Sequence, residues 1–272
     1  MMRRTAFAAL AALALLGRMP AEAGTLRVCA DPNNLPFSNV AGQGFENRIV
    51  ALIAQDWGDD VRYTWWAQRR GYVRNTLKAG HCDLWPGVAT RVAMLATTSP
   101  YYRSSYVFIT RAGSGLDIDS LDDPRLRHLR IGVQMIGNDA MNTPPAHALA
   151  RRGITGNVRG YSIFGDYTQP NPPAAIVRAV ARGDIDVALV WGPLAGYFAA
   201  QQPVKLRLAP VRPALDGGIL PMTFAISMGV RKGNAALRQH LERELARRHD
   251  AIMAILAAYH VPVVPDAAAT TQ

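Results

Sequence analysis

The segment that says most about the fold runs Tyr63-Thr64-Trp65-Trp66-Ala67-Gln68-Arg69-Arg70-Gly71-Tyr72-Val73-Arg74-Asn75-Thr76-Leu77-Lys78-Ala79-Gly80-His81-Cys82-Asp83. Its pattern predicts a strand, a loop, a helix over 70–79 and the start of another strand. Two adjacent tryptophans and a Gln-Arg-Arg run follow the first of these strands. In an open α/β sheet, the carboxyl ends of strands are where ligands or partners are met.

Strands and helices alternate on both sides of this segment. Strands are predicted at 26–30, 61–65, 83–88, 106–110, 129–133, 185–190 and 223–230, and helices at 45–57, 70–79, 144–152, 173–182, 193–200 and 235–260. Helix 45–57 carries an apolar residue at every fourth position, and Gly58 ends it. This alternation predicts an α/β fold with a parallel-type sheet and helices on its faces.

The order of these elements predicts two α/β lobes joined by two crossovers. Residues 24–112 and 221–272 are assigned to the first lobe, 127–208 to the second, and 113–126 and 209–220 to the crossovers. The last helix repeats leucine on one side, which favours its return to the first lobe. Recognition groups are then expected in the cleft, at strand ends and lobe junctions.

Residues 1–23 have the three parts of a secretory signal peptide. Arg3 and Arg4 precede an apolar stretch over 7–16, and the segment ends in Ala21-Glu22-Ala23, a small-x-small cleavage pattern. We expect cleavage after Ala23 and a periplasmic mature protein; a buried N-terminal helix is the alternative. No later stretch reaches the roughly 20 apolar residues of a membrane-spanning helix.

The chain is basic, and this charge indicates which kinds of binding partner to expect. Removing three arginines and one glutamate with residues 1–23 lowers the formal charge from +10 to +8. For an exported protein this favours an acidic protein or an anionic membrane surface over nucleic acid, with a generally basic proteome as the alternative. Arg70, Arg74 and Lys78 form a basic stripe that is either solvated or a docking face. We expect a monomer.

The sequence predicts no enzyme. It lacks a Gly-x-Ser-x-Gly elbow, a P-loop, a Gly-x-Gly-x-x-Gly run opening a helix and a His-Glu-x-x-His motif. The histidines are scattered, and the acidic residues form no dense cluster for calcium or a lanthanide. We therefore predict no catalytic residue, no metal and no cofactor.

Three motifs carry a resemblance to the periplasmic solute-binding proteins, family 3, type II. The motifs are Val28-Cys29-Ala30-Asp31-Pro32-Asn33-Asn34-Leu35-Pro36, the Trp-Trp-Ala-Gln-Arg-Arg-Gly run over 65–71, and Pro-Tyr-Tyr-Arg-Ser-Ser-Tyr-Val-Phe over 100–108. More narrowly, the chain resembles the branch associated with quinoprotein dehydrogenases, the J proteins of methanol oxidation systems.

The resemblance implies two functions that remain open. One is an accessory protein that acts by protein contact in the maturation or activation of a PQQ-dependent methanol or alcohol dehydrogenase. Its partners would be that dehydrogenase, its cytochrome c, or both. The alternative is a binding protein that hands a small polar solute, such as an amino acid, to an ABC transporter.

The two cysteines beyond the signal segment are Cys29 and Cys82. An even cysteine count in an exported protein favours a disulfide. The topology implied by the resemblance makes their strands neighbours, so this bridge is expected. Two free buried thiols are the alternative.

The predicted ligand-binding residues follow strand ends and lobe junctions. They are Asp31, Asn34, Phe37, Trp65, Trp66, Gln68, Arg69, Thr90, Arg91, Tyr101, Tyr102 and Trp191. Gly137, Asn138 and Asp139 are further candidates in the second lobe. The two tryptophans should point to opposite sides if the strand extends that far, so one is expected in the core and the other at a cleft or partner surface.

Arg91 is the candidate anchor for a carboxylate. In amino-acid-binding members of the wider family, an arginine ten residues before the tyrosine of Pro-Tyr-Tyr holds the ligand's α-carboxylate, and Arg91 stands ten residues before Tyr101. An aspartate at the last strand end of the second lobe meets the ammonium there. Residues 188–193 read Ala-Leu-Val-Trp-Gly-Pro, so that carboxylate is missing. A surface turn is the alternative role of Arg91.

Overall fold

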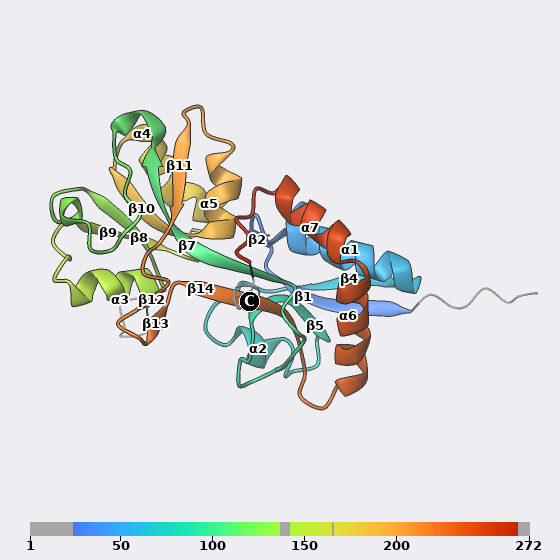
Figure 1. The fold of residues 1–272 in the computed structure, drawn as a ribbon. Coiled ribbons are helices and arrows are strands. Elements are labelled where there is room, and N and C mark those ends of the chain that lie inside the picture. The colour runs from blue at the N-terminus through green and yellow to red at the C-terminus, as the bar shows by residue number, and fades with distance from the viewer. Residues whose placement is uncertain (1–23, 137–141, 165, 266–272) are drawn as a thin grey trace, which may run out of the picture.

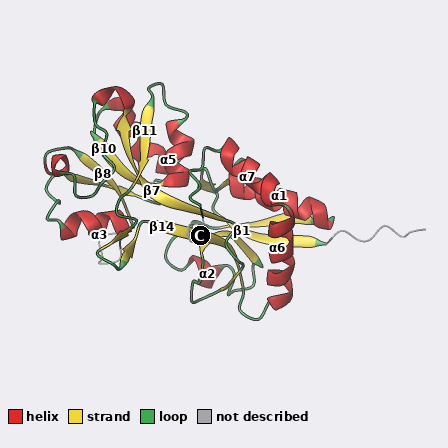
Figure 2. Cartoon of the chain, viewed as in Figure 1, coloured by secondary structure: helices red, strands yellow, loops and turns green. Residues whose placement is uncertain are grey.

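The computed structural model describes residues 24–136, 142–164 and 166–265. It has two α/β lobes whose strands form one continuous sheet (Figure 1, Figure 2). The predicted signal peptide at 1–23 and the candidates Gly137, Asn138 and Asp139 lie outside the described residues. None of the helices in the described part is both long and apolar enough to cross a membrane.

The first lobe is built on a mixed sheet. Its strands follow the order β4 (Asp60–Trp65), β1 (Thr25–Ala30), β5 (Leu84–Ala89) and β14 (Thr223–Val230), with β6 (Ala96–Thr97) paired to β14 and the short strands β2 (Asn33–Asn34) and β3 (Ser38–Asn39) in a separate hairpin. β1 is parallel to β4 and β5, and β14 is antiparallel to β5. The predicted parallel core therefore ends in an antiparallel return strand.

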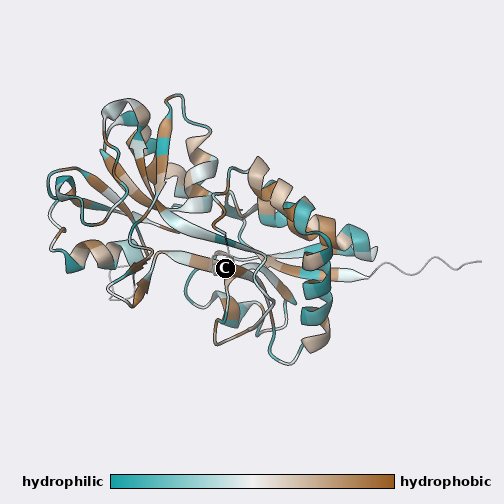
Figure 3. Cartoon of the chain, in the orientation of Figure 1, coloured by the Kyte–Doolittle hydropathy of each residue, from teal (hydrophilic) through white to brown (hydrophobic). Residues whose placement is uncertain are grey.

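Helices cover this sheet because each carries an apolar face. They are α1 (Phe45–Trp57), the short α2 (Tyr72–Asn75), α6 (Ala235–Arg247) and α7 (His249–Ala258). α1 buries Phe45, Ile49 and Ile53 against the sheet, as its four-residue spacing predicts. α6 and α7 contribute Leu241 and Leu256 to the same core, and hydrophilic residues mark the outward side of α6 (Figure 3). Both C-terminal helices therefore pack on the first-lobe sheet, and the assignment of 221–272 to that lobe stays a prediction.

The second lobe repeats the layered arrangement. Its strands follow the order β7 (Tyr102–Arg111), β10 (Val187–Trp191), β8 (Ile131–Met135) and β9 (Val158–Ser162), with β11 (Leu206–Pro210) also on β7. Its helices are α3 (Pro144–Arg151), α4 (Ala175–Arg182) and α5 (Gly192–Ala199), with 3-10 turns η1 (Ala112–Ser114), η2 (Pro124–Arg127) and η3 (Pro172–Ala174). Val107 and Ile109 pack into one core and Phe108 into another, since alternate residues of a strand face opposite sides.

The lobes meet where β7 runs beside β14. β7 pairs with β14 at its start and with β10 and β11 further along. Within the predicted crossover 113–126, Leu121 and Leu126 are buried in a second-lobe core, and the pair β12 (Leu215–Asp216) and β13 (Leu220–Pro221) lies within or beside the other crossover, 209–220. From these pairings we infer that the chain crosses between the lobes within β7 and within β14. The predicted lobe boundaries stay a prediction.

Two predicted helices differ from those in the structure. The helix expected over 70–79 is regular only at α2, because the backbone of Thr76 leaves the helical region and its hydroxyl donates to the Tyr72 carbonyl. The helix expected over 235–260 breaks at Arg248, whose guanidinium pairs with Asp56 of α1. β9 and β11 were not predicted, since neither carries a strong alternating apolar pattern.

Cys29 and Cys82 form the predicted disulfide. Both are fully buried, and their Cα atoms lie 5.5 Å apart. The next residue, Asp83, accepts hydrogen bonds from Arg27 of β1 at 2.7 Å and from Arg231 after β14 at 2.6 Å. The covalent link and this ion-pair cluster therefore hold β1, β5 and β14 in register at one edge of the lobe.

Removing the disulfide should destabilise the protein strongly. The bridge closes a loop with a sequence separation of 53 residues, so Cys29→Ala with Cys82→Ala should lower the free energy of unfolding by about 4 kcal/mol on the chain-entropy model. Urea unfolding measures this change. Wild-type protein reduced before unfolding is the control and should behave like the variant; an unchanged midpoint in both would contradict a stabilising bridge.

Candidate functional site

Asp31 is a fully buried carboxylate at the carboxyl end of β1. One of its oxygens accepts a hydrogen bond from the Asn33 backbone N–H at 2.9 Å. The other accepts from the Gln68 backbone N–H at 2.7 Å and from the Tyr167 hydroxyl at 2.5 Å. Burying a carboxylate is costly without such donors, so these three bonds allow Asp31 to occupy the interior.

Tyr167 belongs to the second lobe, so its bond to Asp31 joins the two lobes. A second link lies beside it: the Asn33 side chain donates to the Gln169 carbonyl at 2.9 Å and accepts from the Asn171 N–H at 3.3 Å. We call these contacts among Asp31, Asn33, Tyr167, Gln169 and Asn171 the latch. Burial, and then the Asp31 carboxylate, raise the pKa of Tyr167, so its hydroxyl remains a donor at neutral pH.

A cavity lies between the lobes next to the latch, which we call the interlobe cavity. Its volume is about 200 Å³, and it is lined by Asp31, Asn34, Phe37, Gln68, Tyr106, Gln134, Ile136, Thr143, Ile163, Phe164, Tyr167, Trp191 and Leu194. Small-molecule sites usually measure roughly 300–1,000 Å³. Among these described lining residues there is no arginine and no lysine, so the cavity offers no cationic side chain to a ligand's carboxylate.

Five of the predicted ligand-binding residues meet in this cavity. They are Asp31, Asn34, Phe37, Gln68 and Trp191. Trp191 packs edge to face against Tyr106 and Phe224, and its backbone N–H donates to the Gln134 side chain at 2.7 Å. The structure brings these five together, and their role in binding a ligand stays a prediction.

The second-lobe side of the cavity was largely missed from the sequence. Gln134 is the next-to-last residue of β8, Thr143 precedes α3, and Ile163, Phe164 and Tyr167 follow β9. Without a prediction for β9, nothing marked the residues after it as a strand end. The hydrogen bond from the Thr143 hydroxyl to the Gln134 carbonyl likewise depends on tertiary structure.

The remaining predicted residues from the Thr90–Tyr102 region lie outside the lining of the cavity. Arg91 is exposed in a left-handed backbone conformation with φ 66°, and its N–H donates to the Thr97 hydroxyl. Thr90 bonds the Ala225 carbonyl and the Ser227 hydroxyl in the sheet. Tyr101 and Tyr102 are buried in the first-lobe core, where the Tyr101 hydroxyl donates to the Pro86 carbonyl at 3.0 Å.

The tryptophan pair and Arg69 lie at different surfaces. Trp65 stacks on Tyr63 at 4.6 Å along the same face of β4, whereas Trp66 is 45% exposed. Arg69 lines a second and larger hollow, and its guanidinium lies 4.8 Å above the Tyr167 ring. Trp65 is half-buried and belongs to no core cluster, so the predicted core position is not seen, and neither tryptophan lines the interlobe cavity.

Glu46 is a second buried carboxyl group close to Asp31. It lies in the first turn of α1 at 3% exposure, and its Oε2 has no hydrogen-bond partner in the structure. Gly87 makes room for it, since a Cβ there would lie only 1.8 Å from Oε1. Burial, and then the Asp31 charge, raise the pKa of Glu46 to about 8. Glu46 is therefore mostly protonated at neutral pH.

No group of three or more histidine, cysteine, aspartate or glutamate side chains that could hold a metal ion occurs among the described residues. The donors gathered at the latch are backbone N–H groups, the Asn33 side-chain amide and a phenol, which bind anions and not cations.

Comparison with known proteins places the chain among binding proteins. The family model of bacterial extracellular solute-binding proteins, family 3, matches residues 26–259. Protein MoxJ of Methylorubrum extorquens is 35% identical over 251 residues, which cover 90% of this chain and 83% of that protein.

Two solved structures extend this likeness to the fold. The periplasmic binding protein XoxJ from Methylobacterium extorquens is 36% identical with a TM-score of 0.72, covering 89% of this chain and 100% of that chain. MxaJ from Methlophaga aminisulfidivorans is 25% identical with a TM-score of 0.74, covering 88% and 100%. The predicted type II binding-protein fold and the predicted resemblance are confirmed.

The buried Glu46 should make stability fall as pH rises. Its folded-state pKa of about 8 lies above the ordinary value of 4.5, so the folded state binds the extra proton between these values. The contribution of Glu46 to the free energy of unfolding is complete below about pH 4.5. It decreases by about 1.4 kcal/mol per pH unit as the pH rises and is gone at about pH 8. Urea unfolding of Glu46→Gln across this range should lack that slope; an unchanged slope would contradict a protonated Glu46.

Tyr167→Phe should loosen the latch. The variant leaves the buried Asp31 with only its two backbone donors, which should lower the free energy of unfolding by about 1–3 kcal/mol. It should also speed amide hydrogen exchange over 31–34 and 167–171. Tyr197→Phe removes a phenol outside the latch and is the matched control. Equal exchange in the two variants and the wild type would contradict the role of Tyr167.

Proposed function

The chain belongs to the bacterial extracellular solute-binding proteins, family 3, in the branch of the MoxJ and XoxJ proteins, and on this premise we propose that it is a periplasmic accessory protein of a PQQ-dependent methanol or alcohol dehydrogenase. It acts by contact with that dehydrogenase, or with its cytochrome c, during maturation or activation. Residues 1–23 are proposed to direct export and to be cleaved off after Ala23.

One observation carries this proposal: the Asp31 carboxylate in the cleft is hydrogen-bonded to groups of the protein itself. Asp31 is the one carboxylate among the described residues that line the interlobe cavity; it has no exposed surface and already accepts hydrogen bonds from Tyr167 and two backbone N–H groups. A ligand ammonium would therefore compete with these donors for the carboxylate. The Tyr167 hydroxyl thus occupies the position beside Asp31 that a hydrogen-bond donor of a ligand would take in a ligand-bound binding protein.

The same cavity is poorly suited to an amino acid. A zwitterion needs an anion for its ammonium and a cation for its carboxylate, and charges buried without partners cost several kcal/mol. Arg91, the candidate for the carboxylate, is exposed and lies outside the cavity lining. These features support protein contact over delivery of an amino acid to a transporter, which remains the second candidate.

Binding measurements separate the two functions. The mature chain should bind the methanol dehydrogenase of its own host, in metal-free or loaded form, with a dissociation constant in the micromolar range by surface plasmon resonance. Binding should weaken as salt rises, because its +8 charge steers encounter and is screened beyond roughly 8 Å at physiological ionic strength.

Calorimetry with the common amino acids tests the transporter function. We expect no affinity tighter than about millimolar, or about −4 kcal/mol. A micromolar amino acid together with no dehydrogenase complex, at tens of micromolar protein and low salt, would overturn the accessory function in favour of the transporter function.

A further inference from the structure

The larger hollow of the protein lies next to the interlobe cavity and opens to solvent. Its volume is about 780 Å³, and it is lined by Gln68, Arg69, Arg70, Gly71, Tyr72, Val73, Arg74, Lys78, Trp85, Val88, Val92, Met94, Ile136, Ile163 and Phe164. We call it the basic groove. Most of its lining comes from 68–94 in the first lobe, and Ile136, Ile163 and Phe164 close it from the second.

The floor of the basic groove is apolar and partly exposed. Trp85 packs against Tyr72 with ring centroids 4.9 Å apart, and Val88 is buried beneath. Met94 is 49% exposed on one side and Ile136 is 42% exposed on the other. Large apolar side chains exposed on both walls of one groove mark an interaction site more often than scattered surface residues do.

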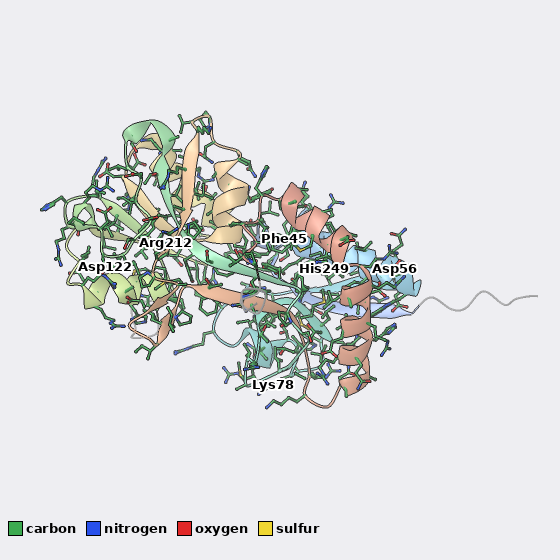
Figure 4. All side chains as sticks on the ribbon, viewed as in Figure 1. Phe45, Asp56, Lys78, Asp122, Arg212 and His249 are labelled. Atoms are coloured by element: carbon green, nitrogen blue, oxygen red, sulfur yellow. A yellow bond between two sulfur atoms is a disulfide. The ribbon has the colours of Figure 1, made fainter. Side chains whose placement is uncertain are left out.

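The rim of the basic groove is cationic. Arg69, Arg70, Arg74 and Lys78 are all exposed along it, and no aspartate or glutamate occurs among the described residues of its lining. Lys78 projects from the outer surface of the first lobe (Figure 4). The predicted stripe of Arg70, Arg74 and Lys78 therefore lies beside an apolar floor, with Arg70 before α2, Arg74 within it and Lys78 in the turns after it.

Building on the proposed function, we propose that the basic groove binds an acidic segment of a partner protein that carries apolar anchor side chains. The anchors pack on Trp85 at the floor and on Met94 at the wall, and carboxylates of the same segment meet the cationic rim. Apolar contacts in a desolvated pocket set the lifetime of such a complex, whereas rim charges set the encounter rate and the salt dependence.

The spacing of the groups favours a protein segment over a small amphiphilic anion. A fatty acid has one carboxylate, which one arginine satisfies in a bidentate pair. Here four cations follow a groove that crosses from one lobe to the other. A chain that presents several carboxylates around its anchors matches that arrangement, and a single headgroup does not.

The first test uses a short fluorescein-labelled helical peptide with glutamates on one face and leucine and phenylalanine on the other. Fluorescence anisotropy should detect saturable binding to the mature chain that weakens with salt. Arg74→Glu with Lys78→Glu, and separately Met94→Ser, should weaken binding about tenfold or more. All three residues are exposed, so thermal unfolding should be near that of the wild type.

Matched controls make the same chemical changes elsewhere. Lys205→Glu with Arg243→Glu has an equal charge change, and Ile219→Ser removes an apolar side chain that is 79% exposed outside the groove. Neither should alter peptide binding. Equal losses in groove and control variants, or no binding of the peptide at all, would overturn the proposal. So would binding of dodecanoate or of phosphatidylglycerol vesicles, but not the peptide, through the same cations.

The same variants measured against purified methanol dehydrogenase distinguish the two proposals. If the dehydrogenase binds the wild type and the Arg74→Glu, Lys78→Glu variant equally, the groove proposal fails and the proposed function stands. If the acidic peptide binds at the groove and the dehydrogenase does not bind the chain, the groove proposal stands and the dehydrogenase is not the partner.

Discussion

The buried carboxylate of Asp31 is the constraint on which the cleft depends. It lies at the end of β1 with no exposed surface, and it is stabilised by two backbone N–H groups and the Tyr167 hydroxyl. These bonds shape the loop after β1, position the Gln68–Arg69 turn after β4 and attach the second lobe. One side chain therefore determines both the shape of the interlobe cavity and the start of the basic groove.

This arrangement divides the surface that a binding protein normally uses for its solute. Asp31 and Tyr167 of the latch line the interlobe cavity, and the basic groove lies beside it. Arg69 connects the two, because it lines the groove and its guanidinium lies over the ring of Tyr167, which lines the interlobe cavity. A fold suited to enclosing a small molecule can in this way present a stable, pre-formed face to a larger partner, which reduces the ordering cost of association.

Local patterns in the sequence predicted most of the architecture, because α1, β1, β14 and the disulfide each depend on periodicity, cysteine count or family topology. The site was predicted only in part. Asp31, Gln68 and Trp191 follow strands with clear signals, whereas Tyr167 follows β9, which has none. Arg91 illustrates the opposite limit: its spacing to Tyr101 matched a ligand clamp, but its side chain lies outside the cavity. In both cases, contacts between segments far apart in the sequence determine whether the residue reaches the cavity.

The most direct measurement is photocrosslinking in the native periplasm, with p-benzoylphenylalanine placed at Met94 in the groove or at Ile219 outside it. Both positions are exposed, at 49% and 79%, so neither replacement should disturb the fold. If the groove is the docking site, the probe at position 94 crosslinks to the methanol dehydrogenase or its cytochrome, identified by mass spectrometry, and the probe at 219 does not. Crosslinks from position 94 to no protein, or equal crosslinking from both positions, would contradict it.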